Sequence, residues 1–195
     1  MKDALLRAAK DLLWEDGYGR MSPARILAAS GAGQGSLYHH FSGKTGLAKA
    51  AIEEIESELS DVARRQFDPA TPPLDRLRAY LLAERDGLKG CRLGRLANEA
   101  DVLASPDLSA PISRYFSLVQ RLITTALEEA MSAGQIEQRI DAHATATMLL
   151  AVVQGGYVIS RASHGREQMA AATGAAWAIL ESLRKDAEGS LNSAP

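Results

Sequence analysis

The side chains best suited to chemistry in this sequence lie between residues 22 and 44, in the stretch SPARILAASGAGQGSLYHHFSGK. Gln34 could pair with adenine through two hydrogen bonds, because an amide carries both a donor and an acceptor. Gly35 lacks a side chain and would let a helix backbone approach a duplex closely. Lys44 is predicted at a helix start, where its charge opposes the helix dipole but suits a nearby phosphate. These residues indicate contacts with nucleic acid.

Two short helices joined by a glycine turn must position these side chains. Ser22 can accept hydrogen bonds from free amides at a helix start, and Pro23 fits the first helical position. Gly31 permits the left-handed backbone that ends this helix and redirects the chain. A second helix of about two turns follows, with Leu37 and Phe41 on its inward face. Its polar side stays free for DNA.

The same stretch resembles the helix-turn-helix of the TetR/AcrR family of one-component transcriptional regulators, whose pattern runs Ile-Ala, Ala-Gly-Val, Gly-Ser/Thr-Leu-Tyr, His-Phe and Ser-Lys. Gly17 and Tyr18 also match the usual end of the preceding helix. Ala32, Gly33 and Gln34 depart from the pattern, in which Val, Ser or Thr, and a basic or polar residue are usual. A glycine N-cap still allows the second helix, but we expect a modest loss of DNA affinity. The matching positions are Ile26, Ala28, Gly31, Gly35, Ser36, Leu37, Tyr38, His40, Phe41 and Lys44.

The resemblance implies DNA contacts of two kinds. Residues at the end of the second helix and just beyond it would bind phosphates, and residues at its start would face the major groove. Arg25 would add a phosphate or base-edge contact from the preceding helix, whereas His40 contacts either DNA or the region of Phe41. The phosphate-binding residues are Tyr38, His39 and Lys44, and the groove-facing residues are Gln34, Gly35 and Ser36.

Length and composition predict an all-α fold. The chain has 195 residues, of which 46% are hydrophobic and 5% aromatic, and no window alternates apolar and polar residues for long enough to suggest a strand. We expect a three-helix DNA-binding domain at 1–48, a larger helical ligand-binding and dimerisation domain at 49–188, and a flexible tail at 189–195. About nine helices are predicted, at 2–17, 22–30, 34–41, 44–67, 75–88, 92–104, 108–131, 141–163 and 167–185.

The charge of the chain is divided unevenly along its length. Residues 1–50 contain seven Lys or Arg and four acids, a net charge of +3, while the whole chain carries −2. A basic head on an acidic body is typical of a DNA-binding domain joined to another domain, although chance asymmetry gives the same pattern. We see neither a signal peptide nor an apolar run of about 18 residues that could span a membrane. The single cysteine, Cys91, fits a reducing compartment, so we expect a cytoplasmic protein.

The last two predicted helices are rich in alanine and glycine, which let helices approach closely. In the TetR/AcrR family the corresponding helices pair with their twofold copies, so the resemblance implies a homodimer through them. Packing within one chain is the alternative interpretation. Two heads on a twofold axis would read a palindrome whose half-sites lie about one or more helical turns apart.

The larger domain should bind a small-molecule effector. The segment GCRLGRLANE, from Gly90 to Glu99, resembles a Gly-Cys-x-Leu-Gly-x-Leu-Ala-x-Glu signature of one branch of the family, which includes repressors of detoxification or efflux genes. Within it, Cys91 is either a reactive sensor activated by Arg92 or a buried small hydrophobe. Effector pockets are apolar with a few polar anchors. The candidate lining residues are Arg85, Cys91, Arg95, Glu99, Tyr115, Phe116, Gln120, Gln154, Tyr157 and Trp177.

These patterns together predict a ligand-responsive DNA-binding regulator, most simply a repressor released from a palindromic operator. The effector would favour a conformation in which the two DNA-binding domains of the dimer are too far apart to bind the operator. The motion would pass through the fourth helix. An activator of the same family and a helical adaptor without DNA binding are the alternatives. A small enzyme using Cys91 with a histidine is a weaker one, because no nucleophile motif or metal-ligand spacing occurs. We therefore expect no catalysis, cofactor or metal.

Overall fold

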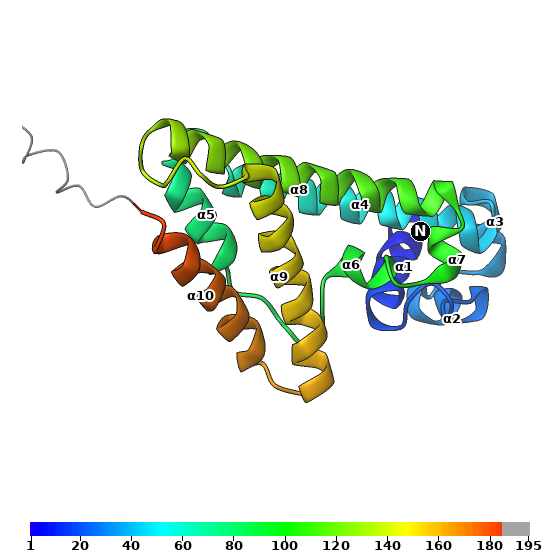
Figure 1. Cartoon of the computed structure of the whole chain (residues 1–195). Coiled ribbons are helices and arrows are strands. Elements are labelled where there is room, and N and C mark those ends of the chain that lie inside the picture. Colours follow the sequence, from blue (N-terminus) through cyan, green and yellow to red (C-terminus); the bar gives the residue numbers. More distant parts are fainter. Residues whose placement is uncertain (185–195) are drawn as a thin grey trace, which may run out of the picture. The chain divides into compact units, whose positions relative to one another are not determined.

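The computed structural model describes residues 1–184, and every regular element within them is an α-helix (Figure 1). An isolated antiparallel bridge joins Ile136 to Arg184. The all-α prediction is confirmed. The ten helices of the described residues are α1 (Lys2–Glu15), α2 (Pro23–Ser30), α3 (Gln34–His40), α4 (Gly43–Gln66), α5 (Pro73–Leu81), α6 (Arg92–Leu96), α7 (Ala100–Leu103), α8 (Pro106–Ser132), α9 (Ala142–Ser163) and α10 (Glu167–Glu181).

The chain forms two compact units. The first contains Met1–Ala63 and Leu88–Leu118, and the second contains Arg64–Gly87 and the chain from Val119 onward. Helices α4 and α8 contribute residues to both units. The boundary predicted at residue 48 divides the chain by function rather than by compactness, and it stays a prediction.

Local sequence determines the start and the end of α2. The Ser22 side chain accepts a hydrogen bond from the backbone amide of Arg25 at 3.3 Å, and Pro23 occupies the first turn. Gly31 ends the helix with a φ of 65°, a left-handed conformation that costs glycine little. The predicted helix start and glycine turn are therefore confirmed.

The core of the first unit joins residues that are far apart in the sequence. Leu13, Ile26 and Leu37, from α1, α2 and α3, have no exposed surface and belong to one hydrophobic cluster. Leu93 of α6 and Val102 of α7 are equally buried in the same cluster. Burying a side chain of this size contributes about 1.5–3 kcal/mol. The segment 88–118 therefore helps to hold the amino-terminal helices together.

Ion pairs at the edge of this core join α1, α4 and α6. Glu58 of α4 lies 2.7 Å from Lys10 Nζ and 3.0 Å from Arg92 Nη1. The hydrogen bond from Lys10 lowers the pKa of Glu58, against the opposing effect of burial. Burial disfavours the charge on Lys10, but its bonds to Glu58 and Glu54 outweigh this and raise the pKa of Lys10. Folding therefore favours the ionised form of Glu58.

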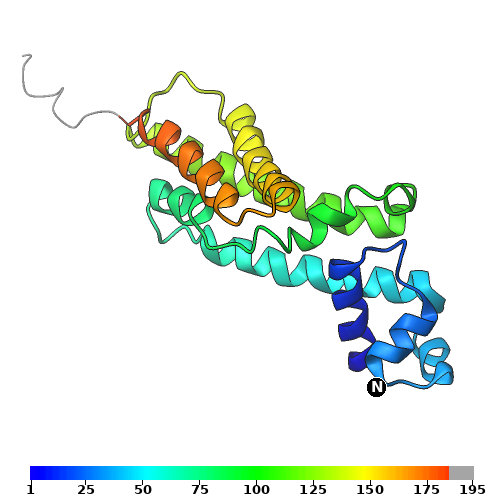
Figure 2. The same cartoon turned by 90° about the horizontal axis from the view of Figure 1, so that it is seen from below.

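Helices α9 and α10 lie side by side in the second unit, as both Figure 1 and Figure 2 show. Each helix buries one face. Leu149 and Val153 of α9 are buried, as are Trp177 and Leu180 of α10. The remaining residues of the two helices include several exposed apolar side chains, which the proposed function below uses.

Helix α5 is shorter than predicted, because it ends at Leu81 rather than continuing through 88. Arg85 Nη1 donates a hydrogen bond to the carbonyl oxygen of Leu81 at 3.2 Å, and Nη2 donates to the carbonyl oxygen of Tyr80. An arginine that binds the last carbonyl groups satisfies a helix end. The side chain that was predicted to line a pocket therefore stabilises the end of α5.

The single helix predicted over 92–104 is wrong, because the structure has two helices, α6 and α7, with Glu99 between them. The Glu99 backbone is extended, with φ −98° and ψ 119°. Its carboxylate accepts hydrogen bonds from the backbone amides of Tyr18 at 3.0 Å and Gly19 at 2.9 Å. A contact with a distant segment thus stabilises the carboxylate at the break between the two helices.

Helix α10 ends at Glu181. The predicted continuation of this helix to 185 and the predicted tail at 189–195 lie outside the described residues. The Asp141 side chain accepts a hydrogen bond from the amide of Ala144 at 2.9 Å, which confirms the predicted start of α9.

One helix is long and apolar enough to span a membrane by length and composition. This helix is α9, with a mean hydropathy of 1.3 over an 18-residue window, of which 28% is buried. The statement drawn from the sequence, that no such run exists, is wrong by this measure. The finding is weak support for a membrane span, since a helix at the surface between two protein chains has the same composition.

Replacing Glu58 with Gln should reduce the acid sensitivity of the fold. The lowered pKa of Glu58 contributes stability that is present above its ordinary value of 4.5 and is lost as pH falls through the lower pKa of the folded state. We expect E58Q to melt at a lower temperature than the wild type at pH 7, with a difference that becomes smaller as the pH falls below 4.5. Thermal unfolding followed by circular dichroism measures this.

The exposed Glu128 of α8 offers a matched control, because E128Q removes the same charge away from the network. An equal shift in melting temperature for E58Q and E128Q at all pH values would contradict the stabilisation that we assign to the ion pairs of Glu58.

Candidate nucleic-acid interface

Helix α3 presents polar side chains around one buried anchor. Leu37 has no exposed surface, whereas Gln34, Gly35 and His39 are exposed and Tyr38 keeps 56% of its surface accessible. Gly33 precedes the helix in an extended conformation and gives it no side-chain hydrogen bond. The prediction of a weakly capped second helix is confirmed.

Lys44 is held at the start of α4 by an aromatic ring. Its Nζ atom lies 4.1 Å from the centre of the Tyr18 ring, within the range of a cation–π interaction. The Tyr18 hydroxyl lies 3.0 Å from Thr45 Oγ1, so the ring is also hydrogen-bonded to the residue after Lys44. Lys44 is half-buried, and its position depends on Tyr18.

Arg25 is engaged within its own domain. Its Nη2 atom lies 2.5 Å from Asp16 Oδ2, and Nη1 donates to the carbonyl oxygen of Arg20 at 3.2 Å. Two of its five donor hydrogens are therefore used by the α1–α2 connection. A contact between Arg25 and DNA stays a prediction.

The two adjacent histidines occupy the last turn of α3 and are both exposed. The His39 and His40 rings meet edge to face with centroids 4.8 Å apart, and the His40 ring lies 6.4 Å from that of Phe41. The alternative that His40 packs beside Phe41 therefore has a contact to support it. The assignment of His39 to phosphate stays a prediction.

The connection after α1 forms a cradle for a carboxylate, which the sequence does not reveal. Glu99 accepts the two backbone hydrogen bonds of Tyr18 and Gly19 through separate oxygens. Gly17 has a φ of 84°, and a Cβ atom at this position would collide with the Glu99 carboxylate. The left-handed backbone favours glycine here, and the missing Cβ atom leaves the space in which the Glu99 carboxylate lies. The sequence indicated the importance of Gly17 and Tyr18 through their match to the family pattern. It did not indicate that Glu99 binds this connection.

The GCRLGRLANE segment makes further contacts with α1. Trp14 Nε1 donates to the carbonyl oxygen of Gly90 at 3.1 Å, and Arg95 Nη1 donates to the carbonyl oxygen of Trp14 at 2.6 Å. Cys91 is half-buried and its sulfur accepts a hydrogen bond from the amide of Gly94 at 3.3 Å, which caps α6. Arg95, Glu99 and Cys91 thus have structural contacts, and their assignment to an effector pocket stays a prediction.

The predicted effector residues are divided between the two compact units. The first unit holds Cys91, Arg95, Glu99, Tyr115 and Phe116, and the second holds Arg85, Gln120, Gln154, Tyr157 and Trp177. Within the second unit, the Gln120 amide donates to Thr147 Oγ1 of α9 at 2.6 Å. Within the first, the Tyr115 and Phe116 rings lie 5.3 Å apart and pack against the hydrophobic core.

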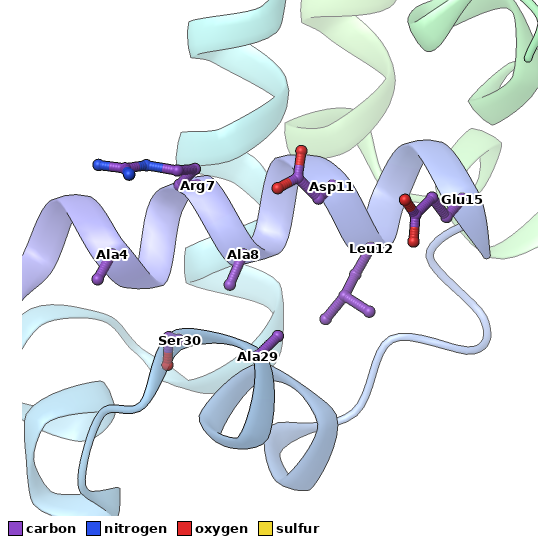
Figure 3. A pocket seen from close by; sticks show the side chains of 8 residues that line it. All are labelled: Ala4, Arg7, Ala8, Asp11, Leu12, Glu15, Ala29 and Ser30. Carbon is purple, nitrogen blue, oxygen red and sulfur yellow. The ribbon is translucent and has the colours of Figure 1, made fainter.

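A surface cavity of about 260 Å³ lies along α1 and α2. Figure 3 shows Ala8 and Leu12 of α1 pointing toward Ala29 and Ser30 of α2, with Asp11 on the outer side of α1. A second cavity of about 300 Å³ is lined by Asp75, Arg78, Ala79 and Leu82. Neither cavity includes a residue that was predicted to bind DNA or effector.

Two family models match the chain. The model described as "Bacterial regulatory proteins, tetR family" matches residues 5–51, and that described as "Tetracyclin repressor-like, C-terminal domain" matches residues 73–176. The second match alone covers more than half of the sequence. The chain therefore belongs to the TetR family of transcriptional regulators.

Curated and solved relatives agree with this family. The transcriptional regulator AcuR of Cereibacter sphaeroides is 29% identical over 150 residues, which are 73% of this chain and 68% of AcuR. The HTH-type transcriptional repressor ComR of Escherichia coli is 23% identical over 177 residues, 86% of this chain and 83% of ComR. A TetR-family regulator from Agrobacterium tumefaciens has a TM-score of 0.82 at 26% identity, covering 94% of this chain and 97% of that one.

Regulators of this family bind operator DNA, respond to small molecules and form dimers, and they are soluble proteins rather than enzymes. The predictions of a DNA-binding transcriptional regulator and of a function other than catalysis are confirmed by these matches. The individual DNA contacts and effector contacts are not tested by them.

Replacing Gly17 with Ala should destabilise the fold more than the same change at Gly19. Alanine at Gly17 meets both a left-handed backbone, which costs about 1–2 kcal/mol, and the carboxylate of Glu99. At Gly19 the added carbon would lie 3.7 Å from Glu99 Oε2, an ordinary contact. Urea unfolding of G17A and G19A measures the difference. Equal stability of the two variants would contradict the left-handed conformation of Gly17.

Proposed function

We propose that the chain is a homodimeric repressor whose two α3 helices read the half-sites of a palindromic operator and which a small molecule releases. The observation that carries the proposal is the exposed polar face of α3, fixed from behind by the buried Leu37. A helix of about two turns reads few base pairs, so two copies on a twofold axis are needed for specific binding. The relative ComR is a transcriptional repressor, which supports repression over activation.

On this proposal, the two kinds of DNA contact come from neighbouring positions. Gln34, Gly35 and Ser36 enter the major groove at the start of α3, where an amide can pair with adenine. Tyr38, His39 and Lys44 bind phosphates, which position the helix without reading sequence. Arg25 adds a phosphate or base-edge contact from α2, while its guanidinium also pairs with Asp16.

We also propose that α9 and α10 form the dimer interface. Four large apolar side chains on these helices are exposed in the single chain: Met148 (45%), Val158 (63%), Ile159 (52%) and Ile179 (60%). A Cβ atom added at Gly155 or Gly174 would meet nothing within 4 Å, so space for close helix approach exists beside both glycines. An exposed apolar surface of this kind marks a contact with another protein. A partner over α9 also accounts for its apolar composition in a protein that we propose to be cytoplasmic.

We propose that the effector binds the larger helical domain, with α4 connecting this domain to the DNA-binding helices. Helix α4 runs without interruption from Gly43 to Gln66 and carries residues of both compact units. An effector that binds one conformation better by about 2–3 kcal/mol would change operator affinity roughly 30- to 150-fold. The effector itself would be a small molecule with apolar surface and a few polar groups.

Operator binding should depend on salt and on Lys44. Genomic fragments selected by the wild-type protein provide the operator, and fluorescence anisotropy at several salt concentrations gives the slope of log affinity against log salt. K44A removes one phosphate contact from each subunit of the dimer, so it should reduce the magnitude of this slope by about 1.8. The loss of affinity should be similar for all DNA sequences.

Arg139 is exposed between α8 and α9 and provides the matched control, because R139A removes an equal charge outside the proposed interface. Absence of any salt-dependent binding by the wild type would contradict the proposed function. An unchanged slope for K44A would remove Lys44 from the phosphate contacts.

Dimerisation should be lost when charge is placed on the exposed face of α10. Burying an aspartate without a partner in an apolar interface is strongly unfavourable, so I179D should sediment as a monomer at micromolar concentration. Analytical ultracentrifugation measures the change. Leu103 of α7 is 56% exposed, and L103D introduces the same charge at an apolar site outside the proposed interface. A dimeric I179D, or a monomeric wild type, would rule out this interface.

A further inference from the structure

We propose that Glu99 is a positioning residue for DNA binding, which fixes the phosphate-binding Lys44 through the backbone and the ring of Tyr18. This inference rests on the proposed function, since it assigns Lys44 to phosphate. It adds a residue that touches no DNA, lies 55 positions away from Lys44 in the sequence, and belongs to the segment from Gly90 to Glu99.

The first link is the bond between Glu99 and the chain after α1. One carboxylate oxygen accepts from the amide of Tyr18 at 3.0 Å and the other from the amide of Gly19 at 2.9 Å. Two charge-assisted hydrogen bonds to successive amides restrict both the position and the direction of this backbone. Gly17 leaves the space in which the carboxylate lies.

The second link runs from Tyr18 to the start of α4. The Tyr18 ring holds Lys44 Nζ at 4.1 Å from its centre, and its hydroxyl lies 3.0 Å from Thr45 Oγ1. A lysine side chain has four rotatable bonds and loses much of its freedom when it binds a phosphate. Holding the ammonium group in place before DNA arrives reduces that cost. The Glu99 carboxylate fixes the backbone that carries the ring.

The third observation concerns what Glu99 is attached to. The segment that ends at Glu99 is also hydrogen-bonded to α1. Arg95 Nη1 donates to the carbonyl oxygen of Trp14 at 2.6 Å, and Trp14 Nε1 donates to the carbonyl oxygen of Gly90 at 3.1 Å. Leu93 and Leu96 anchor it in the hydrophobic core. A shift of this segment would therefore move Tyr18, and with it Lys44.

The test is a double-mutant cycle between Glu99 and Lys44, read as the salt dependence of operator binding. Glutamine at position 99 replaces one acceptor oxygen with a donor that faces a backbone amide, so E99Q breaks the cradle while keeping the size of the side chain. We expect E99Q to reduce the slope of log affinity against log salt toward that of K44A, a change of up to about 1.8 in a dimer. The E99Q/K44A double variant should match K44A alone.

Additive losses in the double variant, or an unchanged slope for E99Q, would overturn the inference while leaving the proposed function intact. A wild type that binds no fragment would instead overturn the proposed function, and the inference with it. The exposed Asp101 on α7 gives the matched control, because D101N removes the same charge two residues away. Should E99Q fail to fold, Y18L repeats the cycle with Lys44, since it removes the ring and keeps the amide that binds Glu99.

Discussion

The structure depends on the burial of Leu37, the side chain that fixes a helix too short to be stable alone. Helix α3 has seven residues, and isolated helices of fewer than about 12 residues are marginal in water. It also begins at Gly33 without a side-chain cap. Its stability must therefore come from packing, and Leu37 is completely buried in a core shared with α1, α2, α4 and the segment that contains α6 and α7. The polar residues on the opposite side stay free because this one face is anchored.

The same short helix explains why the rest of the chain is organised as it is. Two turns of helix expose too few side chains to select one site in a genome, so a second head is required and a dimer interface must exist elsewhere on the chain. We propose that the exposed apolar residues of α9 and α10 meet this requirement. In the proposed function, phosphate contacts supply the remaining affinity. The proposed role of Glu99 and the Tyr18 ring is to keep one of these contacts, that of Lys44, in place.

Sequence alone predicted those elements whose ends are determined by neighbouring residues. Ser22, Pro23 and Gly31 set the limits of α2 through interactions within a few positions, and Asp141 does the same for α9. The break between α6 and α7 was missed because Glu99 binds amides about 80 residues away, and no local pattern records such a bond. The overextension of α5 has a similar cause, since Arg85 turns back onto the helix end. For the site, residue types indicated DNA contact, whereas the partners of Lys44 and Arg25 became visible only in three dimensions.

Hydroxyl-radical footprinting of the wild-type protein on a fragment selected from genomic DNA tests most directly whether two copies of α3 read DNA together. A dimer with one α3 helix in each half-site should protect two sequence-related segments, inverted about a common centre and separated by about one or more helical turns. The protection should weaken at both segments together as salt is raised. Protection of a single segment without twofold symmetry, or of two segments that respond to salt independently, would contradict a dimer of reading heads.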